Sequence, residues 1–297
     1  MPNTIPAASC ETMHYPQPDT AKAGYFHDCP PDPACRHCTD RSAVPDSFDW
    51  SFLDGVYCIS LQERPERTSA VAAQLHRVGL CRHVRFYRPA RDDDDPVSGI
   101  WRSHREVARH ALSKGQSRVL TLEDDVIFSR WASPRRVRSV ADAIGSLPDG
   151  WWIFYLGHWP LKVRRIRRHI IATTSACTHA YVASPPLLTW LSQSEPQRIK
   201  TKGRWSGILG GGIDAAFTQL PGTYALFPMM VLQNTSPSDH LRRDKRGRVR
   251  RLRHLIGRTW VREYLQSWMM RPNEFLVFAL SRLRSIVDYV STPLVGT

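Results

Sequence analysis

Three consecutive acidic residues, Glu123, Asp124 and Asp125, follow an apolar run that predicts a buried strand. In an extended segment, residues two apart point to the same side, so Glu123 and Asp125 share a face and Asp124 points away. Two carboxylates held close together repel each other unless a cation lies between them. Oxygen ligands suit Mg²⁺ or Mn²⁺, completed by phosphate oxygens of a substrate. The triplet therefore predicts a divalent-cation site, the alternative being an ordinary solvated strand end.

A second group of candidate metal ligands lies near the N-terminus and consists of His27, Cys29, Cys35, His37 and Cys38. The Cys35-x-x-Cys38 pair and Cys29 could offer thiolates to zinc, with either histidine as the fourth ligand. Structural zinc sites normally use two well-spaced ligand pairs, and only one clear pair is present here. The alternative is an unstructured arm that binds no metal. Three further cysteines are interpreted as buried thiols: Cys58, Cys81 and Cys177.

The acidic triplet needs a scaffold, and apolar runs in the sequence alternate with helical patterns. We predict strands at 56–61, 84–87, 118–122 and 151–157, and helices at 65–79, 100–114 and 185–192. Two further extended runs are expected at 170–174 and 179–183. This alternation predicts an α/β sandwich with a mostly parallel central sheet. Ligands of such sheets bind beyond the carboxyl ends of the strands, which is where the triplet lies.

Composition sets limits on the class of protein. The chain has 297 residues, of which 42% are hydrophobic, and a formal net charge of +14, so disordered and fibrous classes are excluded. The positive charge favours an anionic partner: nucleic acid, nucleotide phosphates or an acidic membrane face. No run of about 18 uncharged apolar residues and no secretory signal pattern is found. We therefore expect a cytoplasmic protein.

We predict three regions along the chain. Residues 1–50 hold eight of the 22 prolines and are expected to form an irregular, largely unpacked arm. Residues 51–240 form the α/β domain, and residues 241–297 form a basic, helical C-terminal extension. The extension has ten Lys or Arg residues between 241 and 262. It could lie on an anionic membrane at the inner face, or it could be a solvated face with a helix packed on the domain.

Two sequence blocks resemble glycosyltransferase family 25, which includes lipooligosaccharide and collagen galactosyltransferases. The first is the strand at 56–61 followed by Arg64-Pro65-x-Arg67, and the second is Ser103-His104 followed by the Leu-Glu-Asp-Asp segment at 122–125. Weaker similarities continue to about residue 240, in the family's order. The resemblance departs from the family pattern at Ser60, where an asparagine is usual.

The resemblance implies a GT-A fold in which a divalent cation, Mn²⁺ or Mg²⁺, holds a sugar-nucleotide diphosphate. Asp125 is then the expected main metal ligand. Glu123 would bind the metal through water or hold the ribose or sugar of the donor, and Asp124 is counted with the donor-binding residues. Arg64 and Arg67 could approach the nucleotide, although Arg64 could instead brace the turn.

Three further residues receive roles from this resemblance. Asp214 follows three glycines and is the candidate base for an inverting transfer; the alternative is an ordinary N-cap for a helix at 215–220. His104 could shape the donor pocket or be a core histidine that ties its helix to the neighbouring strand. His240 could complete the metal coordination.

The implied function is transfer of a sugar, such as galactose, from a UDP-sugar to a glycan or glycolipid acceptor, as in lipopolysaccharide biosynthesis. Five basic residues between Lys162 and Arg168 are expected to overhang the site, where they could meet a phosphorylated acceptor or remain solvated. Two alternatives stay open. A basic nucleic-acid-binding protein would use the arginine-rich segment at 242–262. A non-catalytic member of the family would act as a partner in polysaccharide assembly.

Overall fold

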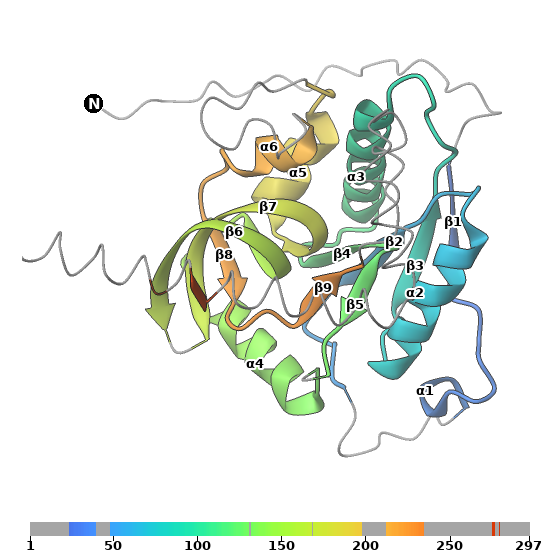
Figure 1. Ribbon diagram of the computed structural model, residues 1–297, viewed down its shortest axis with the longest axis horizontal. Coiled ribbons are helices and arrows are strands. Elements are labelled where there is room, and N and C mark those ends of the chain that lie inside the picture. Colours follow the sequence, from blue (N-terminus) through green and yellow to red (C-terminus); the bar gives the residue numbers. More distant parts are fainter. Residues whose placement is uncertain are drawn as a thin grey trace, which may run out of the picture.

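A seven-stranded sheet forms the centre of the protein, with strands in the order β1-β3-β2-β4-β7-β6-β8, and a two-stranded sheet pairs β5 with β9 (Figure 1). The computed structural model describes residues 24–39, 48–130, 132–167, 169–197 and 212–234, together with residues 275, 276 and 279. The strands are β1 (Tyr25–Asp28), β2 (Gly55–Ile59), β3 (Val84–Arg88), β4 (Val119–Glu123), β5 (Val126–Phe128), β6 (Ile153–Arg167), β7 (Ile170–Ala183), β8 (Thr223–Leu226) and β9 (Val231–Gln233). The helices are α1 (Arg36–Thr39), α2 (Pro65–Arg77), α3 (Pro96–Ser113), α4 (Pro134–Gly145), α5 (Pro185–Gln193) and α6 (Ile213–Phe217).

Most strands of the large sheet point the same way. β3, β2 and β4 are parallel neighbours, and β6 and β8 also run parallel to each other. β7 is antiparallel to both β4 and β6, so β6 and β8 share the direction of β2, while β1 at the edge is antiparallel to β3. Only β1 and β7 are therefore reversed, and the predicted α/β fold with a mostly parallel central sheet is confirmed.

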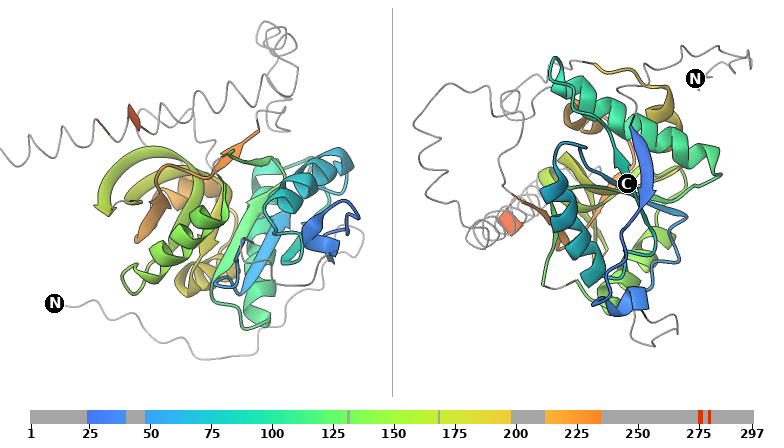
Figure 2. Two further views of the ribbon diagram at one scale, coloured as in Figure 1. Left: turned by 90° about the horizontal axis from the view of Figure 1, so that it is seen from below. Right: turned by 90° about the vertical axis from the view of Figure 1, so that its right-hand side faces the viewer.

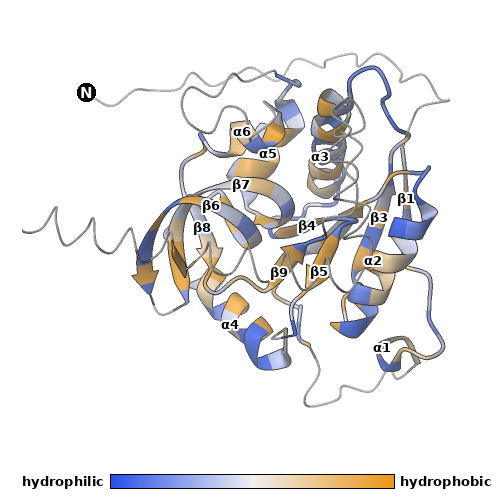
Figure 3. Cartoon of the chain, viewed as in Figure 1, coloured by the Kyte–Doolittle hydropathy of each residue, from blue (hydrophilic) through white to orange (hydrophobic). Residues whose placement is uncertain are grey.

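Helices cover both faces of the sheet. α2 and α4 pack on one face through residues such as Leu75 and Val140, and α3, α5 and α6 pack on the other through residues such as Trp101 and Leu188. Figures 1 and 2 show the sheet between these two helical layers, and in Figure 3 the inner faces of the helices are apolar and their outer faces polar. This amphipathic pattern is the 3.6-residue periodicity that predicted the helices from the sequence.

Proline fixes where several helices begin. Four of the helices have a proline in their first turn, where its missing N–H leaves no hydrogen bond unmade: α2, α3, α4 and α5. α3 therefore starts at Pro96, with Asp95 as its N-cap, rather than at residue 100 as the apolar periodicity predicted. The apolar face begins only at Ile100, so periodicity alone misses the polar first turn.

The two extended runs predicted at 170–174 and 179–183 form a single strand, β7. The polar residues between them remain in the strand, although Cys177 has a positive φ of 73°. The pairing of β6 with β7 is irregular at this point, between Gly157 and Trp159. β7 is thus one bent strand that passes the end of β4, which brings its residues 177–179 to the acidic triplet.

The segment at 24–50 is more ordered than the predicted irregular arm in parts of its described residues. Residues 25–28 form the edge strand β1 on β3. Trp50 is 1% exposed, and its indole N–H donates a hydrogen bond to the carbonyl of Val78 at 2.8 Å. The aromatic side chains of this segment pack on the domain. The high proline content had predicted an irregular arm instead. The predicted C-terminal extension, 241–297, lies outside the described residues except for 275, 276 and 279.

None of the helices in the described ranges is both long and apolar enough to span a membrane.

Candidate active site

The acidic triplet lies where the central strand ends. β4 finishes at Glu123, and Asp124 and Asp125 form a two-residue turn that leads into β5. Since β3, β2 and β4 are parallel, this turn lies at the carboxyl edge of the sheet, where ligands of α/β proteins bind. The turn sends the three side chains to three different sets of partners.

Glu123 is held by two side chains from opposite directions. Its Oε1 accepts a hydrogen bond from the hydroxyl of Thr178 at 2.7 Å, and His104 Nε2 lies 3.5 Å from the same oxygen. Burial alone would raise the pKa of Glu123, but His104 and Thr178 outweigh it and hold the pKa below its usual range. The Glu123 side chain is 24% exposed, so an ionised carboxylate reaches the surface here.

His104 itself is a buried connector between helix and sheet. Its side chain is 1% exposed, and Nδ1 lies 2.8 Å from the hydroxyl of Tyr181 on β7. The ring therefore bridges α3 to β7 and to the end of β4. The histidine therefore ties the helix to the sheet, as one of its two interpretations from sequence predicted, and it also contacts Glu123; the role in a donor pocket stays a prediction.

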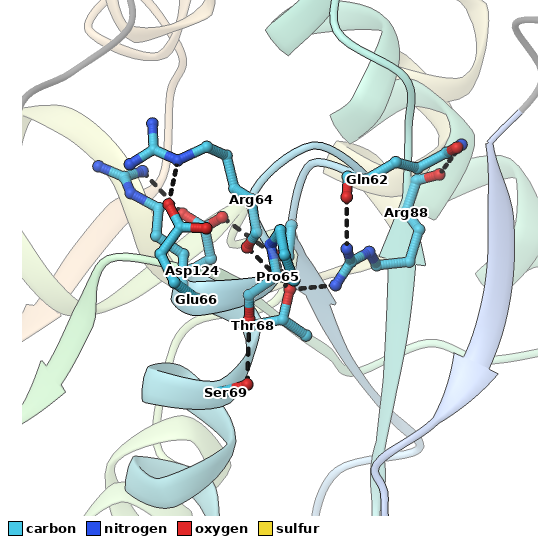
Figure 4. A network of polar contacts seen from close by, with 10 residues as sticks. Gln62, Arg64, Pro65, Glu66, Thr68, Ser69, Arg88 and Asp124 are labelled. Atoms are coloured by element: carbon cyan, nitrogen blue, oxygen red, sulfur yellow. Dashed lines mark hydrogen bonds and ion pairs between the residues drawn. The ribbon is translucent and has the colours of Figure 1, made fainter.

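Asp124 points away from Glu123 and toward the first turn of α2, as the alternation predicted. Its carboxylate accepts hydrogen bonds from Arg67 Nη1 at 2.9 Å and from the Ser60 hydroxyl at 3.0 Å. Burial raises the pKa of Asp124 in spite of Arg67. Arg64 is the residue before this turn of α2 and forms an ion pair with Glu66 (Figure 4). The Asp124–Arg67 pair thus fixes the acidic turn to α2.

Asp125 is the most strongly perturbed of the three. Gln233 Nε2 donates to its Oδ2 at 3.1 Å, while its Oδ1 is buried without a hydrogen-bond partner in the described part of the chain. Burial, followed by the charges of Glu123 and Asp124, raises the pKa of Asp125 well above its usual range. A buried, unpaired carboxylate oxygen is costly unless a proton or a cation satisfies it.

Asp214 reaches the same place from a distant part of the sequence. It lies in the first turn of α6, whose N-cap is Gly212, so the alternative that Asp214 is itself the N-cap is wrong. Its Oδ1 is buried with no hydrogen-bond partner among the described residues. Burial and the charge of Glu123 raise the pKa of Asp214 to about 6, and interaction with Thr178 partly offsets the rise.

The bend in β7 connects these carboxylates. At Cys177 a residue with a β-carbon adopts the left-handed conformation, which costs on the order of 1 kcal/mol. Burial, and then the negative charges of Asp214, Glu123 and Asp125 in that order, raise the pKa of the Cys177 thiol well above its usual range. The Cys177 thiol at the bend thus lies within electrostatic range of all three acids.

A neutral histidine completes this environment. His179 is fully buried, and burial lowers its pKa to about 4 even though Glu123 opposes the change. The ring is therefore uncharged near neutral pH and does not neutralise the acids. His158, also fully buried, contacts the hydroxyl of Ser175 at 2.7 Å.

The structure brings four of the predicted site residues together: Glu123, Asp125, Asp214 and His104. Asp124 and Arg67 pair beside them, and Arg64 forms an ion pair with Glu66. His240 lies outside the described residues, as do Gly210 and Gly211. The sequence did not single out Thr178 or His179, since a threonine and a histidine in a strand carry no signal without the bend that directs them.

The basic segment predicted to overhang the site lies elsewhere. The β6–β7 hairpin curls so that residues 170–172 pair with β8, while β8 also pairs with residues 153–155 at the start of β6. Lys162 and Arg164 accordingly line a cavity of about 370 Å³ beside Thr223 at the start of β8. β8 starts opposite the beginning of β6, and β6 runs parallel to β4. The cavity therefore lies toward the other edge of the sheet from the end of β4.

The carboxylates offer oxygen ligands that suit a hard cation. The unpaired oxygens of Asp125 and Asp214 are the kind of ligand that Mg²⁺ and Mn²⁺ prefer, and a cation would relieve the repulsion from Glu123 that adds to burial in raising both pKa values. Their atoms are less tightly gathered than those of a finished metal site. Within the described ranges, only a cysteine and histidine group places three or more candidate ligand atoms all within 4.8 Å of one another.

No model of a protein family matches the sequence, and no curated protein matches it either. In structure the chain is similar to A197 from STIV, with 13% identity and a TM-score of 0.35 over 62% of this chain and 86% of that chain. It is similar to a glycosyltransferase involved in the glycosylation of the major capsid of PBCV-1, with 12% identity and a TM-score of 0.29 over 46% and 63%. It is also similar to a UDP-glucose pyrophosphorylase complexed with UDP-glucose, with 9% identity and a TM-score of 0.34 over 58% and 72%. Similarities of this size assign no function, so the resemblance to family 25 stays a prediction.

Proposed function

We propose that the protein is a glycosyltransferase that uses a nucleotide-diphosphate sugar and a divalent cation. The supporting observation is the convergence of Glu123, Asp125 and Asp214 at the carboxyl edge of the sheet, with two buried carboxylate oxygens left unpaired among the described residues. Buried, unpaired carboxylate oxygens on Asp125 and Asp214, both close to the charge of Glu123, are unfavourable for the fold by itself. The arrangement is understandable if the charge is used to bind a cation and to accept a proton.

Asp125 and Glu123 are the residues that would hold the cation. Asp125 offers its unpaired Oδ1, and Gln233 fixes the other oxygen. Glu123 is kept ionised and oriented by His104 and Thr178, which is the second layer of support that metal-binding carboxylates commonly have. When bound, Mn²⁺ or Mg²⁺ would supply Lewis-acid stabilisation of the charge that develops on a leaving diphosphate.

Asp214 is the proposed general base. A pKa of about 6 leaves most of the carboxylate ionised near neutral pH while making it a better proton acceptor than an ordinary aspartate. As the acceptor hydroxyl attacks the anomeric carbon, its proton passes to Asp214 Oδ1, and the bonding electrons leave with the nucleoside diphosphate. The sugar configuration is inverted in this single displacement.

Arg67 and Asp124 have a positioning role in this proposal. Their ion pair fixes the turn that carries Asp125, and the pair is largely buried, with 17% and 9% of the side chains exposed. Arg64 braces the start of α2 through Glu66. These contacts support the alternative in which Arg64 stabilises the turn and does not contact the nucleotide.

The donor and acceptor in this proposal follow the resemblance to family 25. We propose a UDP-sugar, such as UDP-galactose, as the donor and a glycan or glycolipid as the acceptor. The cytoplasmic location and contact of the segment at 242–262 with an anionic membrane belong to the same proposal.

The test is a thermal-shift screen of the purified chain against UDP-, GDP- and CMP-sugars, each with and without Mn²⁺. A true donor at a hundredfold excess over its Kd should raise the melting temperature by roughly 5–10 °C, and only with the cation. Asp125→Asn should lose the shift, whereas Asp142→Asn, an exposed aspartate on α4, should keep it. Failure of every sugar nucleotide to shift the wild-type protein, or equal shifts without a cation, would contradict the proposal.

Asp214→Asn separates the base from the donor site. Donor binding should persist in this variant while transfer falls by roughly 10²-fold or more. Loss of donor binding would instead assign Asp214 to the donor or cation site.

A further inference from the structure

Four side chains from two separate segments meet at the far end of α2 from the acidic turn: Cys35, Cys38, His76 and Cys81. Cys35 lies directly before α1, and Cys38 lies within it. His76 lies in the last turn of α2, and Cys81 lies in the loop between α2 and β3. Figure 1 shows α1 beside this end of α2, and Figure 2 shows the same contact from another side. The described ranges contain no other cluster of this density.

The loop after α2 is shaped to return Cys81 to the helix end. Gly79 has a φ of 71°, a conformation that glycine adopts readily, and the amide of Leu80 donates to the carbonyl of Leu75 at 3.0 Å. A β-carbon at Gly79 would come within 3.4 Å of the His37 ring. The reversed chain puts Cys81 next to His76 and under α1.

The distances within the cluster match those of tetrahedral zinc. Ideal bonds of about 2.3 Å to sulfur and 2.0–2.1 Å to nitrogen give sulfur–sulfur separations of about 3.8 Å and sulfur–nitrogen separations of about 3.5 Å. Cys81 Sγ lies 3.9 Å from Cys35 Sγ and 3.5 Å from Cys38 Sγ. Cys38 Sγ lies 3.5 Å from His76 Nδ1. These three separations are close to the zinc values, and all four ligand atoms lie within 4.8 Å of one another.

We propose that Cys35, Cys38, His76 and Cys81 bind one structural zinc ion. The ligands form two pairs, Cys35-x-x-Cys38 and His76-x₄-Cys81, which is the two-pair arrangement that structural zinc sites use. The sequence shows the first pair plainly, but the second pair lies about 40 residues later on a helix and a loop. Cys81, interpreted from sequence as an unreactive buried thiol, is thus a ligand in this proposal, while His27 and His37 are not.

The site is structural because protein atoms supply all four ligands. Cys35 and Cys81 are 8% and 6% exposed, and a four-ligand site leaves no open position for water or substrate. Three thiolates, a neutral histidine and Zn²⁺ carry a net charge of −1. Arg36 and Arg82 follow Cys35 and Cys81 in the sequence and act electrostatically on His37, so positive charge lies near this part of the chain.

Cys29 has a supporting role. Its Sγ lies 3.9 Å from His76 Nε2, on the side of the ring away from Cys38. When Nδ1 binds the metal, Nε2 carries the proton and points at the Cys29 sulfur. Cys29 therefore orients the imidazole without being a ligand, as outer partners of metal-binding histidines commonly do.

The first test is the zinc content of the full-length chain purified without chelators. One zinc ion per chain is expected by elemental analysis, and Co²⁺ in its place should give the visible absorption of a tetrahedral thiolate site. A zinc-free protein with freely reactive thiols would overturn the proposal. A Cys38–Cys81 disulfide in the purified protein, detected by mass spectrometry without reductant, would overturn it too.

Matched variants assign the ligands. Cys35→Ser and Cys81→Ser should lose zinc, whereas Cys58→Ala, which removes a core thiol outside the cluster, should keep one ion. Cys29→Ser should keep the stoichiometry but weaken zinc binding by roughly 10–100-fold. His76→Cys should retain zinc as a four-cysteine site, and His76→Ala should not. If Cys35→Ser and Cys81→Ser kept full zinc, the proposed ligand set would be wrong.

The wild-type protein provides a test that does not depend on a variant folding. A thiol-modifying reagent should release one zinc per chain as the cluster reacts, and a zinc-sensitive dye should report it. Thiol modification without zinc release would contradict the proposal.

Discussion

The two polar clusters at opposite ends of α2 differ in how complete they are. In the cysteine cluster, sulfur and nitrogen atoms already lie at the separations a tetrahedral metal requires. At the acidic turn, carboxylates from β4, the turn after it and α6 interact electrostatically. Two of their oxygens remain unpaired among the described residues. The first cluster needs only its metal, whereas the second needs partners from outside the chain. A complete ligand set suits a structural role, and an incomplete one suits a site that substrate finishes.

The electrostatics of the two clusters support the same distinction. Burial, and after it the charge of Glu123, raises the pKa values of Asp125 and Asp214, so a cation that binds there competes with protons. Cation binding at the acidic turn is therefore expected to release protons and to be readily reversible. Soft thiolate ligands in a closed site hold zinc far more tightly than carboxylates hold Mn²⁺.

The largest effect is expected from Asp125→Asn. This change removes the charge on the best-placed cation ligand while keeping the side-chain shape, so sugar transfer should fall by roughly 10³-fold. The measurement is donor turnover at saturating Mn²⁺, with Asp142→Asn as the matched control. Turnover of Asp125→Asn within a few-fold of wild type would remove Asp125 from the cation site.

The second-largest effect is expected from selective metal removal, which should distinguish the roles of the two clusters. Desalting should abolish transfer, because Mn²⁺ leaves, and adding Mn²⁺ back should restore it with the melting temperature little changed. A strong chelator should also extract zinc slowly, and the melting temperature should then fall by about 10 °C because the segment at 35–38 loses its tie to α2. The proposed difference between the two clusters would be wrong if one treatment removed both metals at the same rate or if zinc loss left the melting temperature unchanged.

Asp214 should make the manganese-free protein less stable as pH rises. Its pKa is about 6 when folded and near 3.9 when unfolded, so folding favours the protonated form. That contribution is fully present below about pH 4 and is lost as pH rises through about 6. Between about pH 5 and pH 7, the free energy of unfolding of wild type should drop by ~1 kcal/mol relative to Asp214→Asn.

Denaturant unfolding of both proteins across this pH range, with zinc bound, measures the difference. Mn²⁺ should reduce the slope in wild type, because the cation replaces the proton. Parallel pH profiles for wild type and Asp214→Asn would show that the pKa of Asp214 is not raised in the folded protein.

The smallest effect is expected from Thr178→Val. Loss of the hydroxyl removes the 2.7 Å hydrogen bond that, after His104, lowers the pKa of Glu123, so this pKa should rise and Mn²⁺ affinity should fall roughly tenfold. Thr178→Ser keeps the hydroxyl and should bind Mn²⁺ like wild type. Equal affinity in all three proteins would limit Thr178 to packing.

Local patterns predicted much of this fold. The alternation of apolar runs located β2, β3, β4 and the start of β6, and Pro65 marked the first turn of α2. The acidic triplet was found from its position after a strand. These features depend on residues close together in the sequence.

Features that depend on distant contacts could not be predicted in the same way. Asp214 joins Glu123 only because β7 bends at Cys177, and no pattern signals a left-handed cysteine. His76 and Cys81 meet Cys35 only because α1 folds against the end of α2. Prolines hid the edge strand β1, because they made its surroundings look irregular.

The central claim is that the acidic turn binds a divalent cation together with a nucleoside diphosphate. The direct measurement is Mn²⁺ binding to the zinc-loaded protein by electron paramagnetic resonance, in which free aqueous Mn²⁺ is counted, with and without UDP. We predict one Mn²⁺ per chain, bound at least about tenfold more tightly with UDP because phosphate oxygens complete the coordination, and lost in Asp125→Asn. Mn²⁺ binding that is absent, indifferent to UDP, or unchanged in Asp125→Asn would contradict the claim.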